Sequence, residues 1–352
     1  MDPVTHAAAG LAISQVLPGP SRGLSALAGL AFALLPDIDY LLTFYDRLAF
    51  LRHHRGFTHS LIALPLLALL GALLGRLLGG PRWFRPVFWM GVAVLASHLL
   101  LDWATSYGTQ LLNPLSNEKF SLDWLFIIDP VMTLILVAGA LSLFSAVYYR
   151  QIALASLALA GAYFLLCGFY HHQALTAARQ ALGASSVRLA ALPQPLSCWR
   201  WHLIAWTPTE VRQAFLSLPL TGLWGSRVQT APAPDNNLAS LNPRAPEADF
   251  QPPDRLEVYT WRGQRWPQEN LAQEVRRLLD IYLDFARFPL LLRTDQVPGS
   301  ATLTWMDLRF TVPGRPFPFI FKVTVDDCGR LASWRMGTGG FSSAGSKEKG
   351  GS

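Results

Sequence analysis

Charged side chains are scarce in this sequence. Of its 352 residues, only 15% are Asp, Glu, Lys or Arg, while 51% are hydrophobic. Soluble domains carry about 25% charged residues, so this composition excludes an ordinary soluble fold for the chain as a whole. The scarcity is concentrated, because four stretches contain no charged residue at all: 56–75, 86–101, 131–149 and 151–170.

These uncharged runs have the length of membrane spans. A spanning helix requires about 20 apolar residues, with ~17 as the lower limit. Three of the runs are long enough by themselves, whereas 86–101 is long enough only if it extends past Asp102 or is partly covered by protein. We therefore expect four membrane spans.

A basic leader is also missing. The chain starts with Met1-Asp2-Pro3, which lacks the positive charge of a cleaved signal peptide. The apolar runs 3–17 and 23–35 are shorter than spans and are separated by Pro18-Gly19-Pro20. This pattern predicts an N-terminal helical hairpin. Together with the four spans it gives an α-helical integral membrane bundle over residues 1–172.

Cysteines are few. Cys167, Cys198 and Cys328 are the only three, and none of them forms a CxxC pair. The sequence therefore gives no signal for a zinc site built from thiolates. A disulfide between Cys198 and Cys328 is possible if this part of the chain lies outside the cytoplasm, and two unpaired thiols fit the sequence equally well.

The chain is basic, with a net charge of +6 and a pI near 9.4. Its basic residues flank apolar runs, as Arg76, Arg82 and Arg85 do, which is the usual pattern of a membrane protein. We therefore expect the lipid bilayer as the partner and do not expect nucleic acid.

The composition changes after His171-His172. We interpret 173–192 as a connector, 193–340 as a small soluble α+β domain and 341–352, which is rich in Gly, Ser and Lys, as a disordered tail. Within the domain, the pattern predicts a strand over 196–206, a loop over 222–253, a strand over 256–261, an amphipathic helix over 269–288, a hairpin of 301–312 with 317–325, and a strand over 331–336.

Histidines and carboxylates gather at the ends of the apolar runs. His54 and His59 precede one run, and His98 and Asp102 end the next, four residues apart and so on one face of a helix. Following the chain across the membrane places these residues, with His6, Asp37 and Asp39, on one membrane face, here called the ligand face. Imidazoles and carboxylates at this depth are costly without a partner.

This clustering predicts a metal site. We expect His54, His59, His98 and Asp102 as ligands, with His6 as a further candidate. Asp37 and Asp39 would be ligands or the general base, and Arg55 would bind an anionic group of a substrate. The mixture of nitrogen and oxygen donors favours zinc, with manganese or iron as alternatives, over calcium.

Each of these residues also has an ordinary interpretation. His98 and Asp102 could form a structural hydrogen bond between helices, and Asp37 could simply cap a helix or face water. Arg55 could be an interfacial anchor. The alternative function is therefore a non-enzymatic membrane protein, whose polar cluster holds helices together and whose C-terminal domain binds a partner.

The same residues resemble the YdjM family of membrane-bound, predicted metal-dependent hydrolases. The matching pieces are Thr5-His6 with Gly10, Asp37-x-Asp39, His54-Arg55-Gly56-x-Thr58-His59-Ser60, and His98-x3-Asp102 followed by Tyr107-Gly108-Thr109. The resemblance covers about residues 1–150, and the HRGxTHS piece is its specific part. It implies hydrolysis, a metal and the inner membrane, and it supplies no substrate.

From these observations we expect a multi-pass protein of the bacterial inner membrane. A metal-activated water would attack an ester or phosphodiester, with a lipid-like, envelope-derived or phosphorylated molecule as the substrate. The loops opposite the ligand face carry Arg76, Arg82, Arg85 and Arg150, which favours the cytoplasm for them. The C-terminal domain is then expected in the periplasm.

Overall fold

A computed structural model describes residues 1–44, 47–183, 188–207, 210–219, 229–232, 250–262, 271–313, 315 and 317–339. Most of the loop predicted over 222–253, and the whole tail predicted over 341–352, lie outside these ranges. The chain divides into two compact units. The first comprises Met1–Ala174 and Ala191–Arg200, and the second comprises Leu175–Ala190 and Trp201–Ser352.

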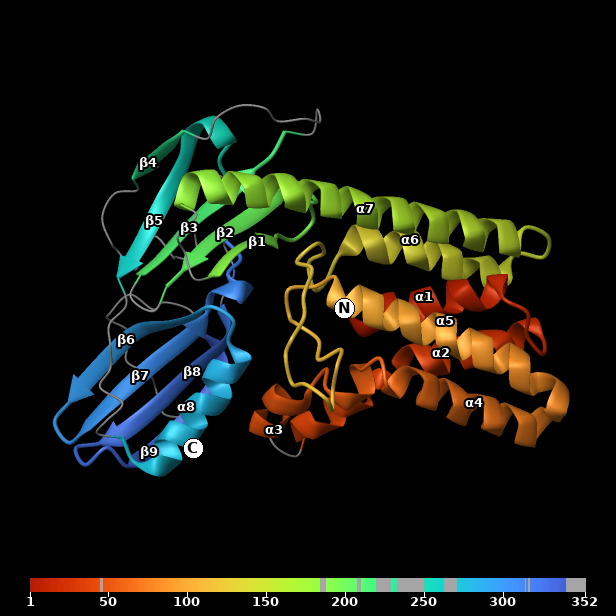
Figure 1. The fold of residues 1–352 in the computed structure, drawn as a ribbon, viewed down its shortest axis with the longest axis horizontal. Helices are drawn as coiled ribbons and strands as arrows, with labels where there is room; N and C mark the ends of the chain where they lie inside the picture. The colour runs from red at the N-terminus through yellow and green to blue at the C-terminus, as the bar shows by residue number, and fades with distance from the viewer. Residues whose placement is uncertain are drawn as a thin grey trace, which may run out of the picture. The chain divides into compact units, whose positions relative to one another are not determined.

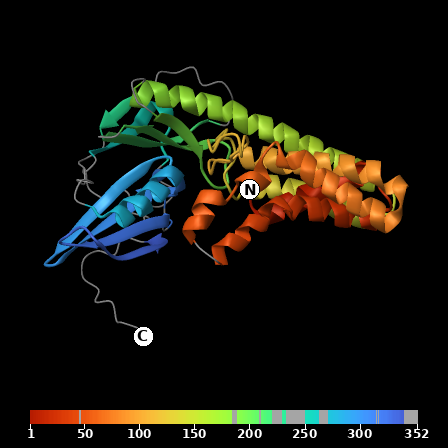
Figure 2. The same ribbon diagram turned by 60° about the horizontal axis from the view of Figure 1, so that its bottom comes forward.

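The first unit is a bundle of helices that lie side by side in both ribbon views (Figures 1 and 2). In chain order its elements are α1 (Pro3–Val16), α2 (Arg22–Leu34), η1 (Pro36–Phe44), α3 (Arg47–His53), η2 (Phe57–His59), α4 (Ala63–Gly79), η3 (Pro81–Trp83), α5 (Phe84–Trp103), α6 (Pro130–Leu141), η4 (Ser142–Phe144) and α7 (Tyr149–Leu182), where η denotes a 3-10 helix.

The predicted N-terminal hairpin is formed by α1 and α2. The Asp2 carboxylate caps α1 by accepting the backbone N–H groups of Val4 and Thr5 at 3.1 and 3.0 Å. The two helices pack closely at Gly10 and Gly29, because a Cβ atom at Gly10 would lie 2.5 Å from the Gly29 carbonyl oxygen. Larger residues at these two positions would push the helices apart.

Phe32 anchors α2 to α4 and α5. It is buried with Ala33, Ala68, Val87, Met90, Val94 and Leu95 in one hydrophobic cluster. Its ring lies against Gly71 of α4 and Gly91 of α5, where an added Cβ would be 2.3 and 2.8 Å from ring atoms. This packing fixes the end of α2, from which the chain continues into η1.

By length and composition, two to four helical segments among the described residues could cross a membrane. Two helices, Pro81–Trp103 and Tyr149–Leu182, are long and apolar enough to cross a membrane. Two further spans are possible if each bent pair counts as one: Arg22–Leu34 with Pro36–Leu42, bent by 49°, and Leu48–His59 with Ala63–Gly79, bent by 67°. The upper limit equals the predicted number of four, but the set differs, because it includes 22–42 and leaves out the predicted span over 131–149.

The span predicted over 131–149 is shorter than expected. The apolar helix there covers Pro130–Phe144 and falls below the length of a span. It ends because the backbone of Ser145 is extended, and the Arg22 guanidinium donates hydrogen bonds to the carbonyl oxygens of Leu143 and Ser145 at 3.2 and 2.8 Å. The carbonyl groups at this helix end are thus satisfied without continuing the helix.

The second unit contains two sheets, and the five-stranded one has the order β1-β2-β3-β5-β4. Its strands are β1 (Arg188–Pro193), β2 (Arg200–Trp206), β3 (Glu210–Ser217), β4 (Thr230–Pro232) and β5 (Leu256–Arg262), with η7 (Pro253–Arg255) before β5. β3 and β5 are antiparallel, and β4 and β5 are parallel.

The predicted connector over 173–192 is instead the end of α7 followed by β1. The strand predicted over 196–206 starts only at Arg200, because a turn with Leu196 at φ 63° precedes it.

The four-stranded sheet has the order β6-β7-β8-β9 and is antiparallel throughout. Its elements are α8 (Gln273–Phe285), β6 (Pro289–Val297), β7 (Ser300–Asp307), η9 (Leu308–Phe310), β8 (Phe317–Asp326) and β9 (Leu331–Gly339). The predicted hairpin and last strand are present, and α8 begins later than predicted. Its apolar face is buried, with Tyr282 stacked on Phe321 of β8 at 4.7 Å between ring centroids.

All three cysteines are free thiols, so Cys198 and Cys328 do not form the disulfide considered above. Cys198 is buried and lies within hydrogen-bonding reach of Cys167 on α7. Cys328 is exposed.

We expect one buried histidine to make the stability of the second unit depend on pH. His202 on β2 is fully buried, stacks on Phe215 at 4.6 Å and lies with Nε2 2.9 Å from Oε1 of Gln213. Burial lowers the pKa of His202 from its ordinary value of 6.5 to about 4, against the smaller opposing effect of the hydrogen bond with Gln213.

We predict that a fragment of residues 175–340, which contains both sheets and α8, folds by itself and loses stability as the pH falls from 6.5 to 4. In this window the unfolded chain binds a proton at His202 and the folded chain does not. Each pKa unit corresponds to ~1.4 kcal/mol, so the free energy of unfolding should fall by about 3 kcal/mol. Urea unfolding at several pH values measures it.

The His202→Gln fragment is the matched control, because it lacks the titrating group and should show a flatter profile. Identical pH profiles for the two fragments would contradict the prediction, as would a fragment that does not unfold cooperatively.

Candidate metal centre

His98 and Asp102 lie one turn apart on α5, as their spacing predicts. Nδ1 of His98 is 2.8 Å from the carbonyl oxygen of Ala33, which can only accept a hydrogen bond. Nδ1 therefore carries a proton, which leaves Nε2 as the ring atom that faces the cluster and could bind a metal ion. Ala33 is held in place by the Phe32 packing, so the fold of α2 sets the orientation of this imidazole.

The chain between α3 and α4 brings in His59. Arg55 adopts a left-handed backbone conformation with φ 58°, which turns the chain after α3. Gly56 follows in a close approach, since a Cβ atom there would lie 2.7 Å from the carbonyl oxygen of His53. His59 then lies in η2, and α4 begins after Ser60, whose Oγ accepts the Ala63 N–H at 3.0 Å. His59 thus precedes α4 and points into the cluster.

The two aspartates of η1 have different partners. Oδ1 of Asp37 lies 3.4 Å from Nε2 of His59 and 3.8 Å from Nε2 of His98. Asp39 faces away from that point. Its Oδ1 is 2.9 Å from Nδ1 of His54, and its Oδ2 accepts the Arg55 N–H at 2.8 Å and lies 3.5 Å from Nδ1 of His59.

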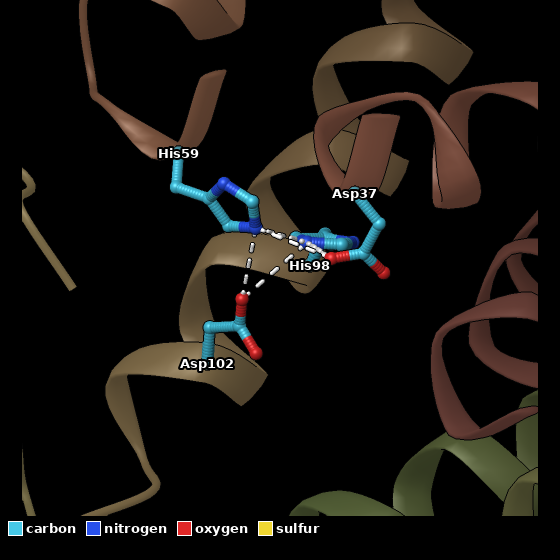
Figure 3. A group of neighbouring side chains, drawn as sticks. All are labelled: Asp37, His59, His98 and Asp102. Atoms are coloured by element: carbon cyan, nitrogen blue, oxygen red, sulfur yellow. Dashed lines mark hydrogen bonds and ion pairs between the residues drawn. The ribbon is translucent and has the colours of Figure 1, made fainter. Parts of the chain in front are cut away.

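Four residues from distant parts of the chain therefore direct their ligand atoms toward the same small region. Asp37, His59, His98 and Asp102 each offer one ligand atom, and these atoms all lie within 4.8 Å of one another (Figure 3). Oδ2 of Asp102 is 3.2 Å from Nε2 of His59 and 3.4 Å from Nε2 of His98. The side chains of His59, His98 and Asp102 are 0–1% exposed, and that of Asp37 is 10% exposed.

The donor set fits a divalent transition metal. Nε2 of His98 and Nε2 of His59 lie 3.1 Å apart, within hydrogen-bonding distance, so both imidazoles present a nitrogen to the same region. Oδ2 of Asp37 and Oδ2 of Asp102 are buried without a hydrogen bond. Two carboxylates and two imidazoles in a buried cluster are a ligand set that suits zinc, manganese or iron.

Oδ1 of Asp102, the oxygen outside the ligand group, contacts the cationic groups of Arg55 and Met1 and the ring of His6. Oδ1 of Asp102 lies 2.9 Å from Nη2 of Arg55 and 3.2 Å from Nε2 of His6, and it contacts the Met1 amino group. Nη1 of Arg55 donates to Oγ1 of Thr105 at 2.8 Å, and the guanidinium lies over the Tyr107 ring at 4.8 Å. The two oxygens of Asp102 thus have separate roles.

The structure brings together three of the four ligands expected from sequence with Asp37, which was predicted as a ligand or the general base. His54 lies outside the group, where it hydrogen-bonds to Asp39 and stacks on Phe50 at 4.5 Å, and Asp37 occupies the remaining place. His6 is adjacent, stacked on His98 at 3.7 Å. Asp39 contacts the group only through His59.

Two contributors were missed by the sequence analysis. Thr105 follows Asp102 by three residues, a helical spacing that could have indicated it. The carbonyl of Ala33 leaves no signal in the sequence, because every residue has a carbonyl group.

Comparisons with known proteins concern this unit. The model of the YdjM inner membrane protein family matches residues 1–174. The chain is 39% identical over 132 residues to the inner membrane protein YbcI of Escherichia coli (strain K12), covering 34% of this chain and 72% of that protein. It is 29% identical over 139 residues to the uncharacterized protein YfhP of Bacillus subtilis (strain 168), covering 37% of this chain and 42% of that protein. No solved structure matches. The family match includes the whole candidate metal centre and ends before β1.

We predict that the purified protein binds one transition-metal ion per chain, and that His59→Ala and His98→Ala each abolish binding. Sites of this kind need three or four ligands, so the loss of one typically disables them. His54→Ala should retain the ion, because His54 lies outside the ligand group. Elemental analysis by mass spectrometry on protein prepared without chelator measures the ratio.

His53→Ala is the matched control, since the His53 side chain is exposed. Each variant should elute from size-exclusion chromatography like the unsubstituted protein. Loss of metal in His54→Ala with retention in His59→Ala would contradict the assignment.

Proposed function

The chain belongs to the YdjM inner membrane protein family, and from this premise we propose that it is a metal-dependent hydrolase of the inner membrane that cleaves an ester or phosphodiester. The observation that carries the proposal is the convergence of the ligand atoms of Asp37, His59, His98 and Asp102 within 4.8 Å. The hydrogen bond from His98 to Ala33 adds support, because it preorganises a ligand before any ion binds.

The residues of the cluster would divide the work of hydrolysis. A bound divalent cation would supply Lewis acidity and lower the pKa of a water molecule. Oδ2 of Asp37, which has no hydrogen-bond partner, would accept the proton of the attacking water as general base. Asp39 would hold His59 and His54 in place. Arg55 would position Asp102, and its Nε, also without a partner, is the atom left for an anionic group of a substrate.

The alternative, a purely structural polar cluster, accounts less well for these contacts. A cluster that only holds helices together gains most when each buried polar atom has a partner. Here Oδ2 of Asp37 is buried without one. The facing atoms of His59, His98 and Asp102 lie 3.1 to 3.4 Å from one another, and an ion between them would be bound by all three residues and by Asp37, which favours the metal-dependent function.

We predict that the zinc-loaded protein hydrolyses bis(p-nitrophenyl) phosphate or p-nitrophenyl butyrate, and that a chelator abolishes the activity while added zinc restores it. Asp37→Asn should lower the rate by about 100-fold or more, the usual contribution of a general base. Release of p-nitrophenolate measures the rate, with His53→Ala as the control of unchanged activity. A metal-loaded protein that is inactive on both compounds would contradict the proposal.

We also propose that the ligand face and the C-terminal unit lie in the periplasm. Arg76 ends α4, Arg82 and Arg85 lie around the start of α5, and Arg150 lies at the start of α7, so four arginines mark the opposite face. Positive residues in short loops favour the cytoplasm. Arg47, Arg52 and Arg55 near the ligand face oppose this assignment, and Arg55 weighs less because Asp102 neutralises it.

Reporter fusions after residue 183 are predicted to show alkaline phosphatase activity and no fluorescence from a reporter that matures only in the cytoplasm. A fusion after Gly80, in the turn between α4 and η3, should show the reverse pattern and serves as the internal control. Fluorescence from the fusion after residue 183 would place the C-terminal unit in the cytoplasm.

A further inference from the structure

Asp37, on η1, is the most exposed of the four residues of the candidate metal centre. Three of its four residues are almost completely enclosed, with side chains 0–1% exposed, and only Asp37 reaches the surface with 10%. A substrate atom that approaches the ligand group therefore passes beside Asp37. Asp37 belongs to η1, which contacts η2, so the exposed side chains of these two segments decide which kind of molecule can do so.

Those side chains are apolar and exposed. We call them the apolar collar: Ile38, Leu41 and Phe44 of η1, Phe57 of η2 and Leu61 directly after it, each between 49% and 90% exposed. They belong to the same two segments that carry Asp37 and His59. Exposed apolar side chains gathered in this way mark a surface that contacts lipid or an apolar ligand.

Neither η1 nor η2 contains a lysine or arginine that could attract a negatively charged substrate. Between Arg22 and Asp46 the only charged residues are Asp37 and Asp39, and 56–75 contains none. The apolar side chains of η1 are therefore not interrupted by a cation, and Arg55, the cation beside the candidate ligands, is buried. An amphiphile would leave its apolar chain on the collar, where burial is favourable by about 25 cal/mol per Å².

The bends of the helices agree with a position at the boundary of the membrane. η1 departs from α2 at 49°, and the segment Leu48–His59 meets α4 at 67°. Both bends therefore lie at the ends of α2 and α4 that carry the candidate ligands. Ester and phosphate groups of lipids lie in the interfacial layer outside the ~30 Å hydrocarbon core.

We propose that the substrate is a bilayer lipid, which reaches the centre past η1 with its apolar chain on the collar and its ester or phosphodiester beside Asp37. The inference rests on the proposed hydrolase function and names its substrate class. Cleavage consumes one water, whose hydroxyl joins the carbonyl carbon or the phosphorus and whose proton goes to the leaving oxygen.

Photolabelling of the full-length protein tests the binding step. The probe is a phosphatidylglycerol with a diazirine near the start of one acyl chain, in dioleoyl phosphatidylglycerol vesicles. Peptides over 36–44 and 57–62 should be labelled several-fold more in the zinc-loaded protein than after chelation. Labelling of Leu77 and Leu78, exposed near the far end of α4 and about 21 Å from its start, should not depend on zinc.

A substrate ratio tests the catalytic consequence. Hydrolysis of dioleoyl phosphatidylglycerol vesicles is divided by hydrolysis of monomeric dihexanoyl phosphatidylglycerol, which has the same bonds and short chains. Leu41→Ser should lower this ratio by about tenfold, the effect of losing one buried leucine contact. Leu77→Ser is the matched control, being 83% exposed against 62% for Leu41, and should leave the ratio unchanged.

The outcomes separate this inference from the proposed function. Zinc-independent labelling of the collar, or an unchanged ratio in Leu41→Ser, would overturn the lipid inference, while hydrolysis of the short-chain probe would still support a hydrolase. Zinc-dependent labelling without hydrolysis of either probe would support lipid binding and contradict the hydrolase function.

Discussion

The burial of one carboxylate, that of Asp102, is the constraint on which the membrane unit depends. An isolated buried charge is very costly, so the surrounding elements must supply positive or hydrogen-bonding partners. Arg55 does so at Oδ1, and His59 and His98 approach Oδ2. The left-handed turn at Arg55 follows from this requirement, because it lets the side chain reach Asp102 while the backbone N–H binds Asp39.

Two of the candidate ligands lie in short 3-10 segments between α-helices. Asp37 is in a 3-10 segment after α2, and His59 is in another before α4, while His98 and Asp102 remain on the continuous helix α5. A regular helix satisfies its own backbone and directs side chains outward, whereas a short turn can direct several polar side chains to one point. The packing of Phe32 against Gly71 and Gly91 makes the break rigid, since it holds the end of α2 against α4 and α5.

The second unit contributes none of the candidate ligands, and the family match ends before its first strand. Its two sheets have their own cores, with Trp201, Leu203 and Ile204 buried in one and Phe321 and Val323 in the other. Metal chemistry and the β-rich unit can therefore be altered separately. The proposals on substrate and sidedness concern the membrane unit, where an apolar surface and the candidate ligands belong to the same short segments.

The sequence by itself determined what depends on local spacing: the apolar runs, the shared helix face of His98 and Asp102, the amphipathic α8 and the β7–β8 hairpin. It also indicated that the polar residues would meet on one face. Only the tertiary structure decided that Asp37, and not His54, lies with His59, His98 and Asp102, because that depends on how 3-10 segments far apart in the chain approach α5. The same holds for the bends that leave the span count between two and four, since helix breaks depend on long-range packing and hydrogen bonds such as those of Arg22.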